Sequence, residues 1–270
     1  MPRKVDVALI TDAIKDMCIE ANHFLTPDMD AVLKEATEKE EAPLGKQVLS
    51  SLQDNLKIAG RDMIPICQDT GMAVVFAEIG QDVQLEGGSL TDAINEGVRR
   101  GYIDGYLRKS VVADPLIRDN TKDNTPAIIH YDIVPGDKIK LTVAPKGFGS
   151  ENMSQIRMFK PSAGLQGIKD FILEAVETAG PNPCPPMVVG VGIGGTFDKC
   201  ALLAKKALMR PLNTENPDPY YADLEKEVVL AGVLDKVEIW SKEAWEARTA
   251  DVEENIEDIA SDMEDLGLSI

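Results

Sequence analysis

Three loops marked by glycine and proline carry many of the polar side chains that could do chemistry. The first reads Pro65-Ile66-Cys67-Gln68-Asp69-Thr70-Gly71. It places a thiol beside an amide, a carboxylate and a hydroxyl, and its glycine allows close backbone approach, a combination that suits metal ligation with adjacent substrate contacts. A cysteine that only fills a tight turn is an equally good interpretation, because free cysteines are often simply buried.

The second loop reads Lys146-Gly147-Phe148-Gly149-Ser150-Glu151-Asn152. Its alternating glycines expose backbone N–H groups near a lysine, and such a nest can bind an anion. It is too short for the phosphate-binding loop of a nucleotide enzyme, which needs a longer glycine-lysine pattern. The alternatives are therefore a small anion site and a structural turn.

The third loop begins at Cys184-Pro185-Pro186 and continues through the apolar run 187–189 into the glycine-rich stretch 190–199. Its glycines formally match the dinucleotide fingerprint, which follows a strand and precedes a helix. That fingerprint also needs a second strand and an acidic residue about 20 positions on. Here the predicted helix 200–209 is followed by Pro211 and a proline- and asparagine-rich stretch, so we expect no dinucleotide site.

Together the three loops resemble the α subunit, or N-terminal half, of the class I fumarase and tartrate dehydratase family of iron–sulfur hydro-lyases. The resemblance covers about residues 5 to 221. The motifs that carry it are Ile66-Cys67-Gln68-Asp69-Thr70-Gly71, Leu107-Arg108-Lys109-Ser110, Asp114-Pro115-Leu116, Lys146-Gly147-Phe148-Gly149-Ser150-Glu151-Asn152-Met153 and Asn182-Pro183-Cys184-Pro185-Pro186, running on to Lys199.

The resemblance implies a cofactor, a 4Fe-4S cluster held by three cysteines with one iron left free for the substrate. Cys67 and Cys184 fall on two of the three ligand positions. An iron with an open position acts as a Lewis acid that polarises the departing hydroxyl group. The expected activity is reversible hydration and dehydration of a small hydroxy-dicarboxylic acid, with fumarate and malate as the first expectation and tartrate as the second.

The resemblance also implies which side chains lie at the substrate. Gln68, Asp69 and Arg108 are expected there, Gly149 in the loop that approaches it, and Lys146 as a neighbour. A guanidinium offers the two-pronged donor geometry that suits a carboxylate. Asp69 is the candidate catalytic residue, for positioning or proton handling, and a separate β subunit is expected to complete the active site.

The chain departs from the family pattern at its end. The third cluster cysteine and a catalytic histidine of the family lie beyond a Gly-Leu-Gly-Gly segment, and none of these occurs after Glu225. The other cysteines, Cys18 and Cys200, lie on predicted helices and are expected to pack in the core, and His130 is expected to be a half-buried strand histidine. The alternative function is therefore a binding protein that keeps the fold without a complete cluster.

Charge and composition narrow the class of protein. The formal net charge of −18 argues against a nucleic-acid partner, whose phosphates need clustered lysine and arginine. No apolar run approaches the roughly 18 residues of a membrane span, and the first residues lack the apolar region of a signal peptide. Four cysteines without regular short spacing do not form a disulfide scaffold. We expect a soluble cytoplasmic protein.

Hydrophobic periodicity predicts a mixed α and β fold, in which N-terminal helices precede a mixed sheet flanked by helices. Residues 1–60 are expected to form a helical scaffold, because apolar residues recur at steps of three and four. Short β-rich runs predict strands, and longer periodic runs predict helices. The strands are expected at 73–79, 127–134, 138–143 and 187–193, and the helices at 92–106, 165–178 and 200–209.

Residues 222–270 differ in composition from the rest of the chain. They hold 15 acidic and 4 basic side chains. Apolar residues from Trp245 to Leu266 alternate steps of four and three, the spacing of a coiled-coil stripe. We expect a cluster-binding domain over 1–221 and an acidic helical tail over 222–270. The tail helix is expected either to pack on its own domain or to dock on a partner, in a hetero-oligomer or a dimer.

Overall fold

The computed structural model describes residues 2–184, 186–212, 214–226, 228–233 and 236–241. The chain divides into two compact units. Unit 1 comprises residues 1–152 and 209–212, and unit 2 comprises 153–208 and 213–270. The two units are described separately below.

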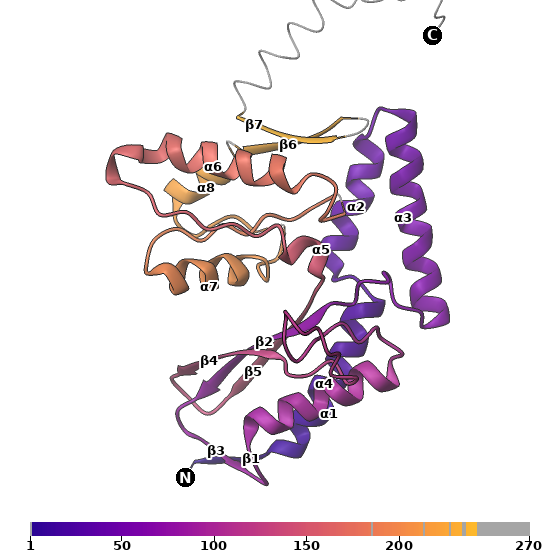
Figure 1. Cartoon of the computed structure of the whole chain (residues 1–270), viewed down its shortest axis with the longest axis vertical. Helices are drawn as coiled ribbons and strands as arrows, with labels where there is room; N and C mark the ends of the chain where they lie inside the picture. The colour runs from indigo at the N-terminus through magenta and orange to yellow at the C-terminus, as the bar shows by residue number, and fades with distance from the viewer. Residues whose placement is uncertain (1, 185, 213, 227, 234–235, 242–270) are drawn as a thin grey trace, which may run out of the picture. The chain divides into compact units, whose positions relative to one another are not determined.

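The centre of unit 1 is a three-stranded sheet in the order β4-β2-β5 (Figure 1). β2 (Met72–Gly80) pairs in parallel with β4 (Ile128–Val134) and antiparallel with β5 (Ile139–Lys146). Almost every residue of β2 is buried, as expected for the middle strand of a sheet. The first of its pairs, Met72 with Lys146, joins the end of the first loop to the start of the second.

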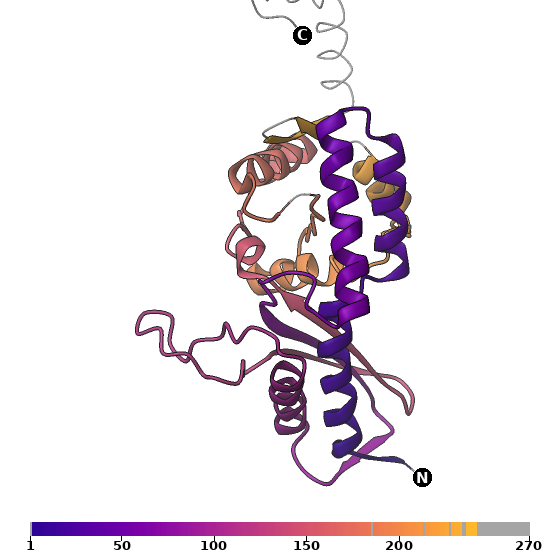
Figure 2. The same cartoon turned by 90° about the vertical axis from the view of Figure 1, so that its right-hand side faces the viewer.

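Helices α1 (Val7–His23) and α4 (Leu90–Asp104) lie side by side against this sheet in both views (Figures 1 and 2). Asp6 caps α1 and Ser89 caps α4, each accepting a backbone N–H with its side chain. The core between helices and sheet is formed by Ile10, Ile14, Cys18, Ala73, Val75, Ile94, Val98, Tyr102, Leu107 and Ala127.

The remaining elements of unit 1 are short strands and a helical pair. β1 (Arg3–Asp6) pairs in parallel with β3 (Val83–Glu86). α2 (Pro27–Lys39) packs on α3 (Pro43–Asp62), where the Gln53 amide donates to Thr37 Oγ1 at 2.7 Å. α5 (Phe148–Glu151) is a single turn after β5. Residues 105–127, between α4 and β4, form a long loop that extends away from the sheet (Figure 2).

Unit 2 contains the 3-10 turn η1 (Pro161–Ala163) and the helices α6 (Gly164–Ala179), α7 (Phe197–Ala207) and α8 (Pro219–Lys226). β6 (Val228–Val233) and β7 (Lys236–Ser241) form an antiparallel pair, and β7 lies against α6 (Figure 1). These strands occupy part of the segment predicted as a helical tail. The stripe from Trp245 to Leu266 lies outside the described residues.

The predicted mixed α and β fold is confirmed, with N-terminal helices before a mixed sheet. The helices predicted at 92–106, 165–178 and 200–209 correspond to α4, α6 and α7, and three predicted strands correspond to β2, β4 and β5. In the part of the chain that the structure describes, no helix is both long and apolar enough to cross a membrane.

The strand predicted at 187–193 is wrong, because this stretch has no strand pairing. It packs directly on α7 instead. A Cβ atom at Gly190 would lie 2.3 Å from the carbonyl oxygen of Ala204, and one at Gly192 would lie 2.1 Å from that of Cys200. These glycines therefore allow backbone to contact a helix, and the strand that a dinucleotide fingerprint requires before its glycines is absent here.

Candidate functional site

The loop Ile66–Gly71 is held at its first residue by two helices. The Ile66 N–H donates to the carbonyl oxygen of Asn22, near the end of α1, at 2.8 Å. The Asn55 amide of α3 donates to the Ile66 carbonyl oxygen at 2.9 Å. Both backbone groups of Ile66 are thus bonded, which fixes the point at which the chain enters the loop.

The other end of the loop is held by a buried phenol and a threonine. The Tyr102 hydroxyl of α4 donates to the Thr70 carbonyl oxygen at 2.7 Å. Burial raises the pKa of Tyr102, so this hydroxyl stays protonated and remains a donor. Thr70 Oγ1 donates to the carbonyl oxygen of Arg108 at 3.1 Å, and this bond places the start of the 108–124 segment beside the loop.

Between these fixed ends lie the three predicted site residues Cys67, Gln68 and Asp69. Cys67 and Gln68 are exposed, and Asp69 is half-buried. The Asp69 N–H points at Cys67 Sγ at 3.4 Å, and the thiol lies 3.4 Å from Gln68 Oε1. A backbone N–H aimed at the sulfur is the kind of hydrogen bond that cysteine sulfurs accept in metal clusters.

The predicted anion nest contains a carboxylate from the protein itself. The Gly149 N–H donates to Asp69 Oδ2 at 3.3 Å, so Asp69 links the first loop to the second. A Cβ atom at Gly147 would lie 2.9 Å from the same oxygen. The glycines of this loop therefore admit the Asp69 carboxylate, and the loop forms the short turn α5.

Lys146 lies next to this nest and faces residues of its own loop. Its Nζ atom contacts Ser150 Oγ and lies 3.7 Å from Glu151 Oε2. The Lys146 side chain is largely buried, with 17% of its surface exposed. These two contacts hold the Lys146 side chain against its own loop.

Arg108 begins the segment that leads from α4 into the long loop, and its side chain is exposed. This segment is fastened by Asn124, whose Oδ1 accepts the N–H groups of Ser110 at 2.7 Å and Val111 at 3.1 Å. Asn124 Nδ2 donates to the Gly71 carbonyl oxygen at 3.0 Å. Unit 1 thus brings five of the predicted site residues together on three connected segments: Cys67, Gln68, Asp69, Arg108 and Gly149, with Lys146 beside them.

The predicted ligand Cys184 belongs to unit 2. It is exposed and lies in a tight turn, where its backbone has a left-handed φ of 58° and its N–H donates to the Pro181 carbonyl oxygen at 3.0 Å. Cys200, on α7 of the same unit, is partly buried and its thiol lies 3.4 Å from the Phe197 carbonyl oxygen.

The remaining candidate groups lie in the packed parts of unit 1. Cys18 is fully buried in the core, and burial raises the pKa of its thiol to about 12. His23 is also buried, with Nδ1 2.6 Å from the Ile19 carbonyl oxygen. His130 lies on β4 opposite Phe76, and their rings stack at 5.1 Å. The prediction of a half-buried strand histidine is confirmed.

These environments predict a fixed order of thiol reactivity for the chain free of metal. Iodoacetamide should modify Cys67 and Cys184 rapidly and Cys200 more slowly, because exposure and thiolate character set the rate. Cys18 should stay unmodified until the chain unfolds, since its pKa of about 12 leaves almost no thiolate at pH 8. Peptide mass spectrometry over a time course measures all four rates. Labelling of Cys18 as fast as Cys67 would contradict this assignment.

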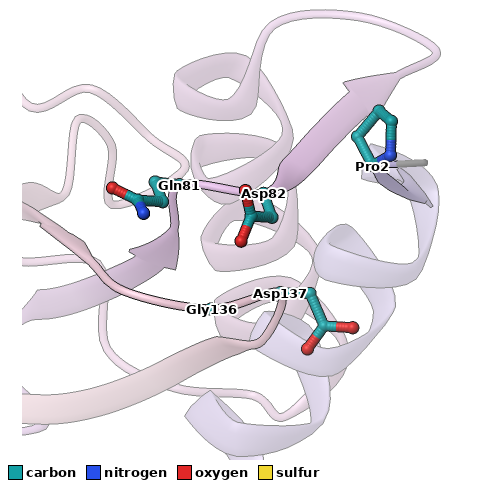
Figure 3. Close-up of a pocket in the computed structure, with 5 residues that line it drawn as sticks. All are labelled: Pro2, Gln81, Asp82, Gly136 and Asp137. Carbon is teal, nitrogen blue, oxygen red and sulfur yellow. The ribbon is translucent and has the colours of Figure 1, made fainter.

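A separate hollow of unit 1 does not involve these residues. It is lined by Pro2, Gln81, Asp82, Gly136 and Asp137, at the turns after β2 and β4 (Figure 3). The Arg3 guanidinium donates to the Asp137 carbonyl oxygen at 3.2 Å nearby. Among the residues that the structure describes, no group of three histidine, cysteine or acidic side chains gathers in a way that could hold a metal ion.

The residues that hold the site were not predicted from the sequence. Asn22, Asn55, Tyr102 and Asn124 all bond the loop 66–71 or its neighbour, yet the first three lie in helices and look like ordinary helical residues. Only Asn124 had a local signal, because Asp123-Asn124-Thr125-Pro126 combines turn formers with a proline.

Comparison with known proteins identifies two matching family models. The model described as fumarate hydratase (Fumerase) matches residues 11–238. A second model, described as MraZ protein, putative antitoxin-like, matches residues 220–266 and overlaps the end of the first match.

Two relatives illustrate the similarity. The chain is 42% identical over 226 residues to the putative L(+)-tartrate dehydratase subunit alpha of Methanocaldococcus jannaschii, over 82% of this chain and 79% of that protein. It is 30% identical over 220 residues to the L(+)-tartrate dehydratase subunit alpha of Escherichia coli O157:H7, over 80% of this chain and 72% of that protein.

Proposed function

The chain belongs to the fumarate hydratase (Fumerase) family, and we propose that it is the α subunit of a hydro-lyase that acts on a four-carbon hydroxy-dicarboxylic acid. Fumarate and malate are the first substrates to test, and L(+)-tartrate is the second. The observation that carries the proposal is the site of unit 1, where an exposed thiol, an amide, a carboxylate and a guanidinium lie on segments bonded to one another.

The proposed cofactor is a 4Fe-4S cluster, and the residues present fit it in part. Cys67 and Cys184 are exposed thiols on loops, the setting in which cysteines bind metal, whereas Cys18 is buried in the core. The Asp69 N–H aimed at Cys67 Sγ matches the hydrogen bonds that cluster sulfurs accept. We propose Cys67 and Cys184 as two of the three cluster ligands. The third ligand is then a group other than these two cysteines.

A cluster with an open iron would supply Lewis-acid polarisation of the hydroxyl group that leaves or adds. The chain's own residues bind and orient the substrate. Arg108 is proposed to pair with a substrate carboxylate through two parallel N–H groups, and Gln68 to donate a neutral hydrogen bond beside it. The Gly149 N–H is already donated to Asp69 Oδ2, so Gly149 is proposed to act by holding that carboxylate at the substrate site.

Asp69 is proposed to handle a proton or to position the group that does. Its Oδ2 accepts the Gly149 N–H at 3.3 Å, which orients the carboxyl group between the two loops. Lys146, held by Ser150 and Glu151, contributes a positive charge at the nest. In a chain with a net charge of −18, such local cations are needed to attract a dianion.

The proposed partner is a β subunit that completes the active site. Both relatives are named as alpha subunits, and within the described ranges of this chain no three histidine, cysteine or acidic side chains gather in a way that could hold a metal ion. A hetero-oligomer of α and β chains therefore follows as part of the proposal.

The exposed free thiols also favour the reducing conditions of the cytoplasm as the working compartment. The division into a domain over 1–221 and a tail over 222–270 remains a proposal as well.

The test is anaerobic reconstitution of the chain with iron and sulfide, alone and together with a β subunit of the same family. We expect about four irons and four sulfides per site, and hydration of fumarate or dehydration of L(+)-tartrate that needs both chains. Fumarate hydration is followed by the loss of its ultraviolet absorbance, and oxaloacetate from tartrate by a coupled assay.

Two results would change the proposal. Full activity of the chain alone would remove the partner from it. No cluster in either preparation would favour the alternative function, a binding protein that keeps the family fold, which the missing third cysteine already motivates.

A further inference from the structure

We infer that Asn124 is a positioning residue that couples the loop 67–71 to the segment beginning at Arg108. The inference deepens the proposed function and rests on it for the roles of Gln68, Asp69 and Arg108. The bonds themselves are features of unit 1 and can be tested without any activity.

The three hydrogen bonds of Asn124 join two segments that lie about 40 residues apart in the chain. Oδ1 accepts from Ser110 at 2.7 Å and from Val111 at 3.1 Å, while Nδ2 donates to the Gly71 carbonyl oxygen at 3.0 Å. The orientation of the amide is determined by these partners. A reversed amide would direct its NH₂ group at two N–H donors and its oxygen at a carbonyl.

The environment of Asn124 makes these bonds strong constraints. Its side chain is 0% exposed, so water cannot replace a bond that is lost. Its backbone has a left-handed φ of 63°, a conformation that asparagine tolerates better than most residues. Both properties fit a residue that is required at this position for its amide and for its backbone.

The two coupled segments carry the groups proposed to contact the substrate. Gly71 directly follows Cys67–Thr70, and Ser110 follows Arg108 by two residues. The bond from Thr70 Oγ1 to the Arg108 carbonyl oxygen is a direct link between them, and the three bonds of Asn124 form a bridge from Gly71 to Ser110 and Val111. Without Asn124, the loop 67–71 and the segment at Arg108 are still joined at Thr70, by its hydroxyl bond to the Arg108 carbonyl oxygen and by the Tyr102 hydroxyl of α4, but the Gly71 end of the loop loses its bond to Asn124.

A loss of this coupling should lower the stability of unit 1 and also the activity of the enzyme that still folds. A misplacement of about 1 Å at a distance from the reacting atoms can cost roughly 100-fold in rate. We expect kcat/KM of the reconstituted αβ enzyme to fall by roughly 100-fold in Asn124→Gly. Glycine is chosen because it adopts a left-handed φ without strain. Asn124→Asp is the second variant. It keeps the shape and both acceptor bonds but presents an oxygen to the Gly71 carbonyl.

Asn95→Ala is the matched control. The Asn95 amide also bonds the 124–127 stretch, through Oδ1 and the Ala127 N–H at 2.8 Å, and its donor bond goes to Thr91 within α4. It therefore loosens the same stretch of chain without removing a bond to either substrate segment. We expect a lowered unfolding temperature with kcat/KM within about threefold of the wild type.

A double-mutant cycle with Arg108→Lys separates positioning from general damage. If Asn124 acts by placing Arg108 against Gln68, Asn124→Gly should cost less than about tenfold in the Arg108→Lys background, against about 100-fold in the wild type. Additive effects, or an equal loss in Asn95→Ala, would overturn the inference.

Hydrogen exchange of the α chain decides the question if the enzyme assay fails. In both Asn124 variants, peptides covering 66–72 and 108–112 should exchange faster together, whereas Asn95→Ala should leave both unchanged. Faster exchange at 108–112 alone would overturn the coupling. A wild-type complex without hydro-lyase activity would contradict the proposed function, and the exchange result would still stand for or against Asn124.

Discussion

Replacement of Cys67 by alanine is expected to abolish cluster binding and to lower turnover of the αβ enzyme by roughly 1,000-fold or more. A Lewis-acid metal contributes several kcal/mol to a transition state, and each 1.4 kcal/mol or so corresponds to a factor of ten. The same loss is expected for Cys184→Ala. Iron and sulfide per chain, the visible absorption of the cluster and kcat are measured on the same preparation.

The fold should survive both substitutions, because both thiols are exposed and contribute little to packing. Circular dichroism and the unfolding midpoint of the metal-free chains should therefore match those of the wild type. Cys200→Ala is the matched control, since its thiol contacts the Phe197 carbonyl oxygen within its own helical turn, and this variant should keep its cluster. A cluster that survives Cys67→Ala but not Cys200→Ala would reverse the assignment of ligands.

The site residues and their chemistry could be predicted from the sequence, whereas the residues that hold them in place could not. Cys67, Gln68 and Asp69 are adjacent in the chain, so a loop that contains them must present them together wherever it lies. Asn22, Asn55 and Tyr102 reach the same loop from three helices. Their roles depend on contacts across 11 to 44 residues of sequence, and nothing in local periodicity encodes them.

The secondary structure shows the same division between local and long-range information. The α4 helix and the strands β2, β4 and β5 follow the predicted ranges within a few residues, because their periodicity is local. The order β4-β2-β5, parallel on one side and antiparallel on the other, depends on pairing between distant strands. The stretch 187–193 was misassigned because a short apolar run with glycines fits a buried strand and also fits backbone packed on a helix.

The nest at Gly147–Gly149 illustrates how a correct local signal can have an unexpected partner. The alternating glycines indicated an anion, and the structure places the Asp69 carboxylate there. The sequence contained both halves of this contact, 80 residues apart, without a signal that joined them.

The charge change near residue 222 lies close to residue 220, where the second family match begins. The predicted stripe beyond Ser241 lies outside the described residues.

Gly71→Ala is expected to destabilise unit 1 by about 2–5 kcal/mol, the sum of a backbone penalty and a steric one. Gly71 has a left-handed φ of 59°, which costs an L-residue roughly 1–2 kcal/mol. A Cβ atom would also lie 2.1 Å from the Lys146 carbonyl oxygen and 2.6 Å from the Gly147 nitrogen. Both neighbours are backbone atoms, so no rotamer change can relieve the contact. Urea unfolding followed by circular dichroism measures the loss.

Gly136→Ala provides the control within the same unit, because its φ is also left-handed, at 100°, and no atom lies within 4 Å of the added Cβ. The difference between the two variants isolates the steric part, and equal losses would show that the approach of Gly71 to Lys146 is unimportant. The clash lies where the loop 67–71 meets the nest at 147–149, next to the first pair of the β2–β5 ladder. Folded Gly71→Ala should therefore also lose the Asp69–Gly149 bond and most of its activity. Gly136→Ala should keep its kcat, because the turn at Gly136 lies at the opposite end of the β2–β5 pair.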